Sequence, residues 1–167
     1  MPWIGALFNS VTARTAGFST YSLGEFSNAG LLVMIFLMFV GASPGSTGGG
    51  IKTSTLFALI QGIKTAATNT SGKAFHYSVP HGVFRKASVI AVMGISVIAV
   101  GTFMLCAFEP DIAIRDALFE MTSAFGTVGL TTGITTGLCT ASKLTSIVMM
   151  YIGRLGPLTI ATLWYFT

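Results

Sequence analysis

Two short segments carry backbone groups suited to binding a cation that has lost its water shell. They read Thr15-Ala16-Gly17-Phe18 and Thr127-Val128-Gly129-Leu130. Carbonyl groups of an extended strand can replace the hydration shell of potassium, and a central glycine lets the backbone present them in series. A single segment of this kind is typical of a turn at a helix end. The pair instead predicts an ion filter that binds K⁺ through the carbonyls of both segments.

The two segments belong to an internal repeat. Residues 15–20 fall on residues 127–132, an offset of 112, and at the same offset Met38-Phe39-Val40-Gly41 falls on Met150-Tyr151-Ile152-Gly153 without any gap. Two matches at one offset indicate two copies of one structural unit. Each copy is predicted to be a short helix, a Thr-X-Gly loop and a long apolar helix.

A glycine-rich stretch interrupts the apolar tract of the first copy. As one helix, Ala29 to Ile63 would be roughly 52 Å long against a hydrocarbon core of about 30 Å, so a break is expected. Pro44 and three consecutive glycines disfavour helix, and non-helical backbone at membrane depth must line a water-filled path. We expect a gate inward of the filter, with a rigid kink that aids packing as the alternative. The predicted gate loop, 41–50, includes Gly41, Pro44, Gly45, Ser46, Thr47, Gly48, Gly49 and Gly50.

The same stretch is partly similar to a phosphate-binding loop, because Gly45 to Gly50 fits GxxxxG. That motif needs lysine directly after its second glycine, whereas here Ile51 follows and Lys52 comes one place late. A phosphate-binding loop also follows a short strand in water, and this one follows a helix-length apolar run. Nucleotide binding is therefore disfavoured.

Two arginines are candidates for holding these loops. Arg154 lies about half-way along the apolar tract Leu144 to Phe166, where a charge is expensive and usually functional. The 112-residue offset pairs it with Ala42, so we predict that it bonds loop carbonyls as the gate latch. The alternative is that it only joins two helices. Arg14 precedes the first filter segment, and we expect it to support the filter through carbonyl or carboxylate bonds, with Glu120 or Asp116 as partners.

The composition predicts that membrane lipid surrounds these elements. Hydrophobic residues make up 52% of the 167 residues and charged residues only 8%, while soluble proteins have roughly a quarter charged. Ala87 to Phe108 and Leu144 to Phe166 match the roughly 20 residues that cross a hydrocarbon core. Ile112 to Phe125, at roughly 21 Å, is too short to cross, and we expect it to enter and return. The C-terminal end of such a helix favours a cation.

The distribution of charge predicts the orientation. Residues 64–86 hold four Lys or Arg and no acid, whereas all five acids lie at the other end of the apolar tracts, so the basic segment is predicted to be cytoplasmic. Lysine and arginine do not follow one solvated face, and no nucleic acid partner is expected. Cys106 and Cys139 both lie near the predicted outer surface, which leaves a disulfide open. No catalytic constellation is found, and the chain is not expected to be an enzyme or to carry a cofactor.

Three stretches together resemble the KtrB/TrkH family of potassium-transporting membrane subunits. They are residues 10–18, 41–52 and 123–130, which appear in family order and at family spacing. The resemblance implies an all-α polytopic membrane fold with four helix, pore-loop, helix units around one pore. Residues 1–66 would be the third unit without its first helix, 67–86 a basic cytoplasmic loop and 87–167 the fourth unit. The segment 41–50 would be the family's intramembrane loop.

The resemblance further implies gated potassium uptake across the bacterial plasma membrane. It also implies a homodimer, a cytoplasmic ring of nucleotide-binding regulatory subunits (KtrA/TrkA-like) and possible dependence on Na⁺. From the residues alone, a secondary carrier that binds its substrate at a broken helix remains the alternative. A Thr-X-Gly loop in each repeat favours the pore.

Overall fold

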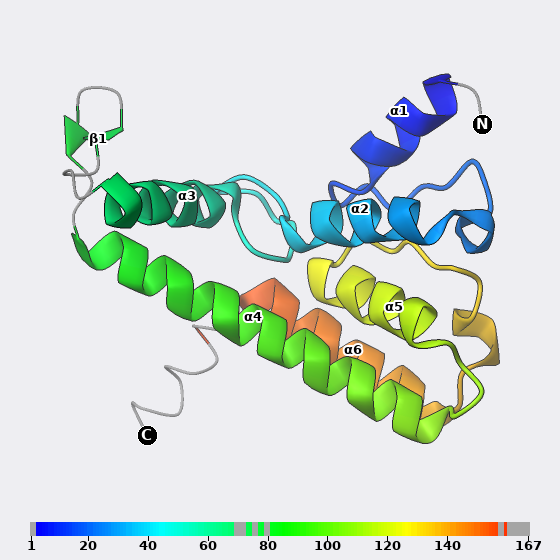
Figure 1. Ribbon diagram of the computed structural model, residues 1–167. Coiled ribbons are helices and arrows are strands. Elements are labelled where there is room, and N and C mark those ends of the chain that lie inside the picture. The colour runs from blue at the N-terminus through cyan, green and yellow to red at the C-terminus, as the bar shows by residue number, and fades with distance from the viewer. Residues whose placement is uncertain (1–2, 69–72, 75–76, 79–80, 157–158, 160–167) are drawn as a thin grey trace.

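The computed structural model describes residues 3–68, 73–74, 77–78, 81–156 and 159. The described part is helical apart from one small hairpin (Figure 1). The helices are α1 (Trp3–Thr12), α2 (Asn28–Phe39), α3 (Thr53–Thr68), α4 (His81–Phe108), α5 (Ile114–Gly126) and α6 (Thr140–Leu155). Short 3-10 turns, η1 (Leu23–Glu25) and η2 (Thr135–Gly137), follow the two filter segments, and β1 (Lys73–Ala74) pairs antiparallel with β2 (Tyr77–Ser78).

Helix α5 is the central element. It packs against α2, α4 and α6 (Figure 1). Its residues from Phe119 to Gly126 are all buried, although at 13 residues it is only about 20 Å long. Two glycines permit the tight packing at its C-terminal end. A Cβ on Gly126 would meet the Met38 carbonyl, and one on Gly153 would clash with the Phe125 carbonyl. The short helix is therefore fixed between three other helices, as expected of a re-entrant helix.

Helix α4 is the one described helix that is long and apolar enough to cross a membrane by itself, over Gly82–Phe108. The predicted span Ala87 to Phe108 lies within it. The helix begins at His81, so Arg85 and Lys86, expected in the cytoplasmic loop, lie in its first two turns.

The tract from Ala29 to Ile63 is broken between Phe39 and Thr53, where the glycine-rich loop lies between α2 and α3 (Figure 1). The tract Leu144 to Phe166 differs from the expectation of one continuous helix. Helix α6 begins earlier, at Thr140, and ends at Leu155, because Gly156 takes a φ of 85° outside the helix. Arg154 is consequently in the last turn of α6 rather than in its middle. Residues 157–158 and 160–167 lie outside the described part.

Candidate ion filter and gate loop

The two predicted filter segments repeat one backbone conformation. Thr15 and Thr127 have φ angles of 67° and 52°, and Gly17 and Gly129 have 79° and 92°. Positive φ is uncommon for a β-branched residue, so its presence at both threonines marks a constrained site. Successive carbonyls of a regular strand point to opposite sides. Left-handed residues at every second position turn them toward one side, which is the geometry of a carbonyl-lined ion path.

The two segments also lie beside each other. A Cβ on Gly17 would clash with the Val128 carbonyl oxygen, and the Gly17 Cα is 3.9 Å from where a Cβ of Gly129 would be. Gly17 is thus required for its positive φ and for the close approach of the second segment. The structure brings together backbone from two regions 112 residues apart, as the repeat predicts.

The first segment is held by a threonine in the preceding helix. The Thr12 hydroxyl donates to the Phe18 carbonyl at 2.6 Å and accepts from the Phe18 N–H at 2.8 Å. Thr12 is buried, and the sequence pattern did not predict its role. Its partner Phe18 is the last residue of the segment, so the two bonds fix that end of Thr15 to Phe18 relative to α1.

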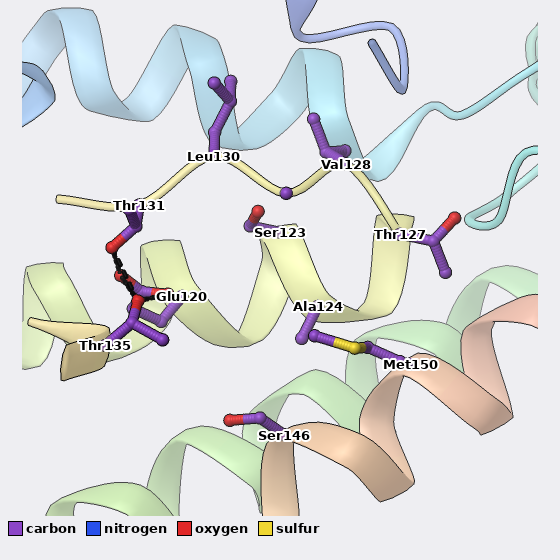
Figure 2. Close-up of a pocket in the computed structure, with 11 residues that line it drawn as sticks. Glu120, Ser123, Ala124, Thr127, Val128, Leu130, Thr131, Thr135, Ser146 and Met150 are labelled. Carbon is purple, nitrogen blue, oxygen red and sulfur yellow. Dashed lines mark hydrogen bonds between the residues drawn. The ribbon is translucent and has the colours of Figure 1, made fainter. Parts of the chain in front are cut away.

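The second segment is held by Glu120 of α5. Its carboxylate accepts hydrogen bonds from the Thr131 hydroxyl and from the Thr135 hydroxyl at 3.2 Å (Figure 2). It also accepts one from the Thr132 N–H at 3.2 Å. Only 8% of Glu120 is exposed. The carboxylate therefore ties the strand that leaves Leu130 to the helix beneath it. A pocket of about 380 Å³ lies between this strand, α5, Ser146 and Met150 (Figure 2).

The predicted partners of Arg14 are wrong, because Glu120 bonds the threonines and Asp116 pairs with a neighbouring arginine. Arg14 Nη1 instead donates to the Val40 carbonyl at 2.8 Å. Val40 follows the last residue of α2, so Arg14 joins the first filter turn to the start of the glycine-rich loop. Arg14 was predicted to bond a carbonyl or a carboxylate that supports the filter. It does bond a carbonyl, but this carbonyl belongs to Val40 at the base of the glycine-rich loop.

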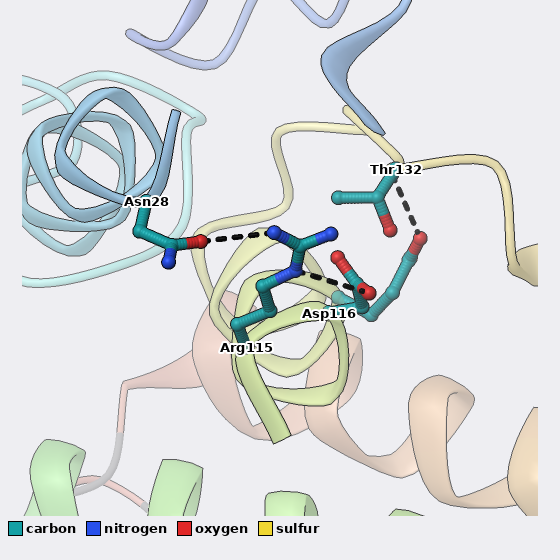
Figure 3. A network of polar contacts seen from close by, with 5 residues as sticks. Asn28, Arg115, Asp116 and Thr132 are labelled. Carbon is teal, nitrogen blue, oxygen red and sulfur yellow. Dashed lines mark hydrogen bonds and ion pairs between the residues drawn. The ribbon is translucent and has the colours of Figure 1, made fainter. Parts of the chain in front are cut away.

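Asp116 belongs to a polar contact at the N-terminal end of α5. Arg115 Nε lies 3.6 Å from the Asp116 carboxylate, and Arg115 Nη1 donates to the Asn28 side chain at 2.9 Å (Figure 3). Thr132 lies close to this contact and donates its N–H to Glu120 (Figure 3). The contact joins the start of α5 to the start of α2, and therefore one repeat to the other.

The glycine-rich loop is closed at its base. Val40 and Ile51 form an isolated bridge, in which the Gly41 N–H donates to the Ile51 carbonyl at 2.9 Å and the Ile51 N–H donates to the Phe39 carbonyl at 3.1 Å. Phe39 stacks on Phe125 with ring centroids 6.3 Å apart, which fixes the base to the end of α5. The exposed residues 43–47 lie farther along the loop, and they include Pro44, Gly45, Ser46 and Thr47.

Lys52 bonds the backbone of the glycine-rich loop that precedes it. Its ammonium donates to the Gly48 carbonyl at 2.6 Å and to the Ser46 carbonyl at 3.1 Å. These carbonyls lack helical partners because the loop is not helical. The lysine that comes one place late for a phosphate-binding loop thus bonds the loop's own backbone. The sequence showed its position but not this role.

The loop touches both filter segments at their first residues. A Cβ on Gly48 would lie 3.0 Å from the Thr15 hydroxyl, and one on Gly49 would lie 2.8 Å from the Thr127 hydroxyl. The Gly49 N–H also donates to Thr127 Oγ1 at 2.9 Å. Consecutive glycines are needed here because any side chain would separate the loop from the filter.

Arg154 does not make the predicted latch contact within the described part of the chain. Its side chain is exposed, and no hydrogen bond joins it to a described loop carbonyl. Its neighbour Gly153 packs on the Phe125 carbonyl, and a Cβ on Gly49 would also lie 3.0 Å from that oxygen. Gly153 and Gly49 therefore approach the same carbonyl, while Lys52 and Arg14 supply the positively charged side chains that bond the loop.

Both cysteines are free, and Cys139 is exposed. The Cys139 N–H donates to the Glu109 carboxylate at 2.6 Å, which joins the end of α4 to the start of α6. Glu109 thereby serves as a structural link at the predicted outer end of the helices.

Comparison with known proteins agrees with this geometry. The family model described as TrkH, cation transport protein, matches residues 3–166. The chain is 39% identical to the Ktr system potassium uptake protein B of Vibrio alginolyticus, over 95% of this chain and 35% of that protein. It is 39% identical to the potassium/sodium uptake protein NtpJ of Enterococcus hirae, over 92% of this chain and 35% of that protein.

A solved structure shares the fold. The crystal structure of the potassium transporter TrkH from Vibrio parahaemolyticus superposes with a TM-score of 0.79 at 24% identity, over 95% of this chain and 36% of that one. The chain spans about a third of the length of the relatives it matches. Its fold is that of a polytopic membrane protein with two pore-loop repeats.

Proposed function

The chain belongs to the TrkH family of cation transport proteins, and from this premise we propose that it lines half of a gated potassium pore. Carbonyls of Thr15 to Phe18 and of Thr127 to Leu130 coordinate the dehydrated K⁺. The observation that carries this proposal is the repeated left-handed pair, Thr15 with Gly17 and Thr127 with Gly129, in two adjacent segments. Backbone oxygens selected by such a conformation suit a cation and provide no group for covalent chemistry.

The loop 41–50 is the proposed gate. It lies against the first residue of each filter segment, and its base is fixed by the Val40–Ile51 bridge. In the closed position it obstructs the path inward of the filter, with Arg154 at the same depth adding a positive charge that opposes cations. The contacts of Gly48 and Gly49 with the threonines favour a gate over a kink that only aids packing.

The surroundings follow from the same premise. We propose a multi-pass protein of the bacterial plasma membrane in which residues 1–66 belong to a third unit, 67–86 to a cytoplasmic loop and 87–167 to a fourth unit. A homodimer above a ring of nucleotide-binding regulatory subunits is the proposed assembly. The names of the relatives support K⁺ as the transported ion, and one of them includes sodium, which makes Na⁺ dependence worth measuring.

The test is rubidium uptake by the complete protein in a bacterial strain that lacks its own potassium uptake systems. A pore predicts unidirectional rubidium flux and growth at low potassium. Flux of an organic substrate that saturates steeply, together with no flux of rubidium, would instead support the carrier alternative and contradict the pore.

A further inference from the structure

Within residues 41–50, the gate loop is hydrogen-bonded to the filter segment 127–130 and only packed against the segment 15–18. Thr15 and Thr127 hold the same position in the repeat, and both have positive φ. The Thr15 hydroxyl donates to the carbonyl of its own neighbour, Arg14, at 2.6 Å. The Thr127 hydroxyl accepts the Gly49 N–H at 2.9 Å, across 78 residues of sequence. Two residues of one type at equivalent positions thus differ in this one bond.

The bond joins groups that water does not readily replace. Gly49 is buried, and a Cβ at this position would lie within about 3 Å of Thr127 and of the Phe125 carbonyl. A buried backbone N–H without a hydrogen-bond partner raises the free energy of the state that buries it. Without the Thr127 hydroxyl, that state is the closed loop, because in a displaced loop the Gly49 N–H can bond water. Loss of the hydroxyl therefore favours a displaced loop.

Thr127 is itself fixed from the other side. It ends α5, and its backbone N–H donates to the Ala124 carbonyl at 3.0 Å while the Val128 N–H donates to Ser123 at 2.9 Å. The hydroxyl is consequently presented from the most deeply buried helix of the described part. A rigidly held acceptor of this kind can position the loop without moving with it.

We propose that the Thr127 hydroxyl is the residue that positions the closed gate loop, so that the loop is anchored to the filter of one repeat and released from that side. The inference rests on the proposed function of the loop as a gate. It assigns Thr127 a second role besides its backbone carbonyl, and it makes Thr15 a matched control within the same molecule.

The test uses the complete protein with Cys106 and Cys139 replaced by serine and the exposed Ser43 replaced by cysteine as a reporter of loop position. Thr127→Val removes the hydroxyl but keeps the branched shape, Thr127→Ser keeps the hydroxyl, and Thr15→Val makes the first change at the equivalent position. In inside-out vesicles, the rate of Ser43→Cys modification by a charged thiol reagent is measured beside rubidium uptake. Thr127→Ala is a second variant should the valine not reach the membrane.

We expect Thr127→Val to raise the modification rate about two- to tenfold, the effect of one lost hydrogen bond, and to raise rubidium uptake. Thr127→Ser should return the modification rate to the parent value, and Thr15→Val should leave that rate unchanged. Equal modification rates in Thr127→Val and Thr15→Val, or no change in either, would overturn the anchor. A parent protein that carries no rubidium would defeat the pore proposal, while the modification rates would still decide the anchor.

Discussion

A few polar side chains hold the backbone of the proposed filter in place. Thr12 fixes Phe18, and Glu120 fixes the strand that follows Leu130. Hydrogen bonds to a charged acceptor contribute about 1.5–3 kcal/mol each, so the carboxylate is the stronger of the two supports. Neither residue needs to touch the ion that we propose for this site, because each would act through the carbonyls that it positions.

Replacement of Glu120 tests this support. Glu120→Ala should lower rubidium uptake at least tenfold and reduce the preference for rubidium over sodium, because the strand after Leu130 loses its acceptor. Glu120→Gln, which keeps an acceptor, should be milder. Competition of sodium with rubidium-86 uptake measures both effects. The exposed Glu25→Gln is the control, and a selectivity loss of equal size in that variant would show that the effect is not specific to the support.

A glycine substitution tests the proximity of the two segments. Gly17→Ala should reduce rubidium uptake to background, because its Cβ would clash with the Val128 carbonyl and its φ is positive. Gly137→Ala is the control, since a Cβ there meets nothing within 4 Å and its φ is not in the left-handed region. Uptake by both variants is compared at equal membrane abundance. Normal uptake by Gly17→Ala would show that the segments do not pack as described.

At the scale of elements, the loop between α2 and α3 is closed at its base and held by two positively charged side chains. Its base is the Val40–Ile51 bridge, and Arg14 and Lys52 bond its carbonyls. The inner part, Gly48 and Gly49, lies against the filter. Release of this part can therefore occur while the base keeps α2 and α3 in place.

Removal of the Lys52 ammonium group should loosen the loop. Lys52→Met takes away the donor to the Ser46 and Gly48 carbonyls and should raise basal rubidium uptake several-fold, measured without regulatory subunits. The exposed Lys64→Met on α3 controls for the loss of one positive charge. A lower uptake in Lys52→Met than in the parent would mean that the lysine holds the loop open rather than closed.

Arg154 follows Gly153, which packs on the Phe125 carbonyl that Gly49 of the proposed gate loop also approaches. Arg154 bonds no described loop carbonyl, so its proposed effect is through charge. Arg154→Ala should raise potassium flux, and Arg154→Lys, which keeps the charge, should be close to the parent. Uptake in the potassium-uptake-deficient strain is the measurement. Unchanged uptake in Arg154→Ala at normal expression would remove Arg154 from the gate.

At the scale of the whole molecule, the repeat could be read from the sequence because it is encoded in local residues. Thr-X-Gly at one offset requires the same backbone turn twice, and Pro44 with three consecutive glycines requires a break in the helix. These features predicted the repeated backbone turn and the interrupted tract, and the structure has both.

What could not be predicted is the choice of partners among equivalent polar groups. The sequence shows Arg14, Glu120 and Lys52, but their contacts depend on which backbone groups the folded loops bring within reach. Arg14 therefore bonds Val40 rather than a carboxylate. Hydropathy also does not predict that α6 ends at Leu155, because the apolar run continues past Gly156. The helix ends there because Gly156 adopts a positive φ. The first residues of such a tract do not reveal where its helix ends.

The central claim is that the carbonyls of these two segments bind the transported cation, and rubidium in a crystal tests it most directly. Crystals of the complete protein grown with rubidium should show anomalous density between Thr15 to Phe18 and Thr127 to Leu130, at coordination distance from the carbonyl oxygens, and this density should disappear when sodium replaces rubidium. Ordered filter segments without rubidium density, or rubidium bound only elsewhere along the pore, would contradict the account.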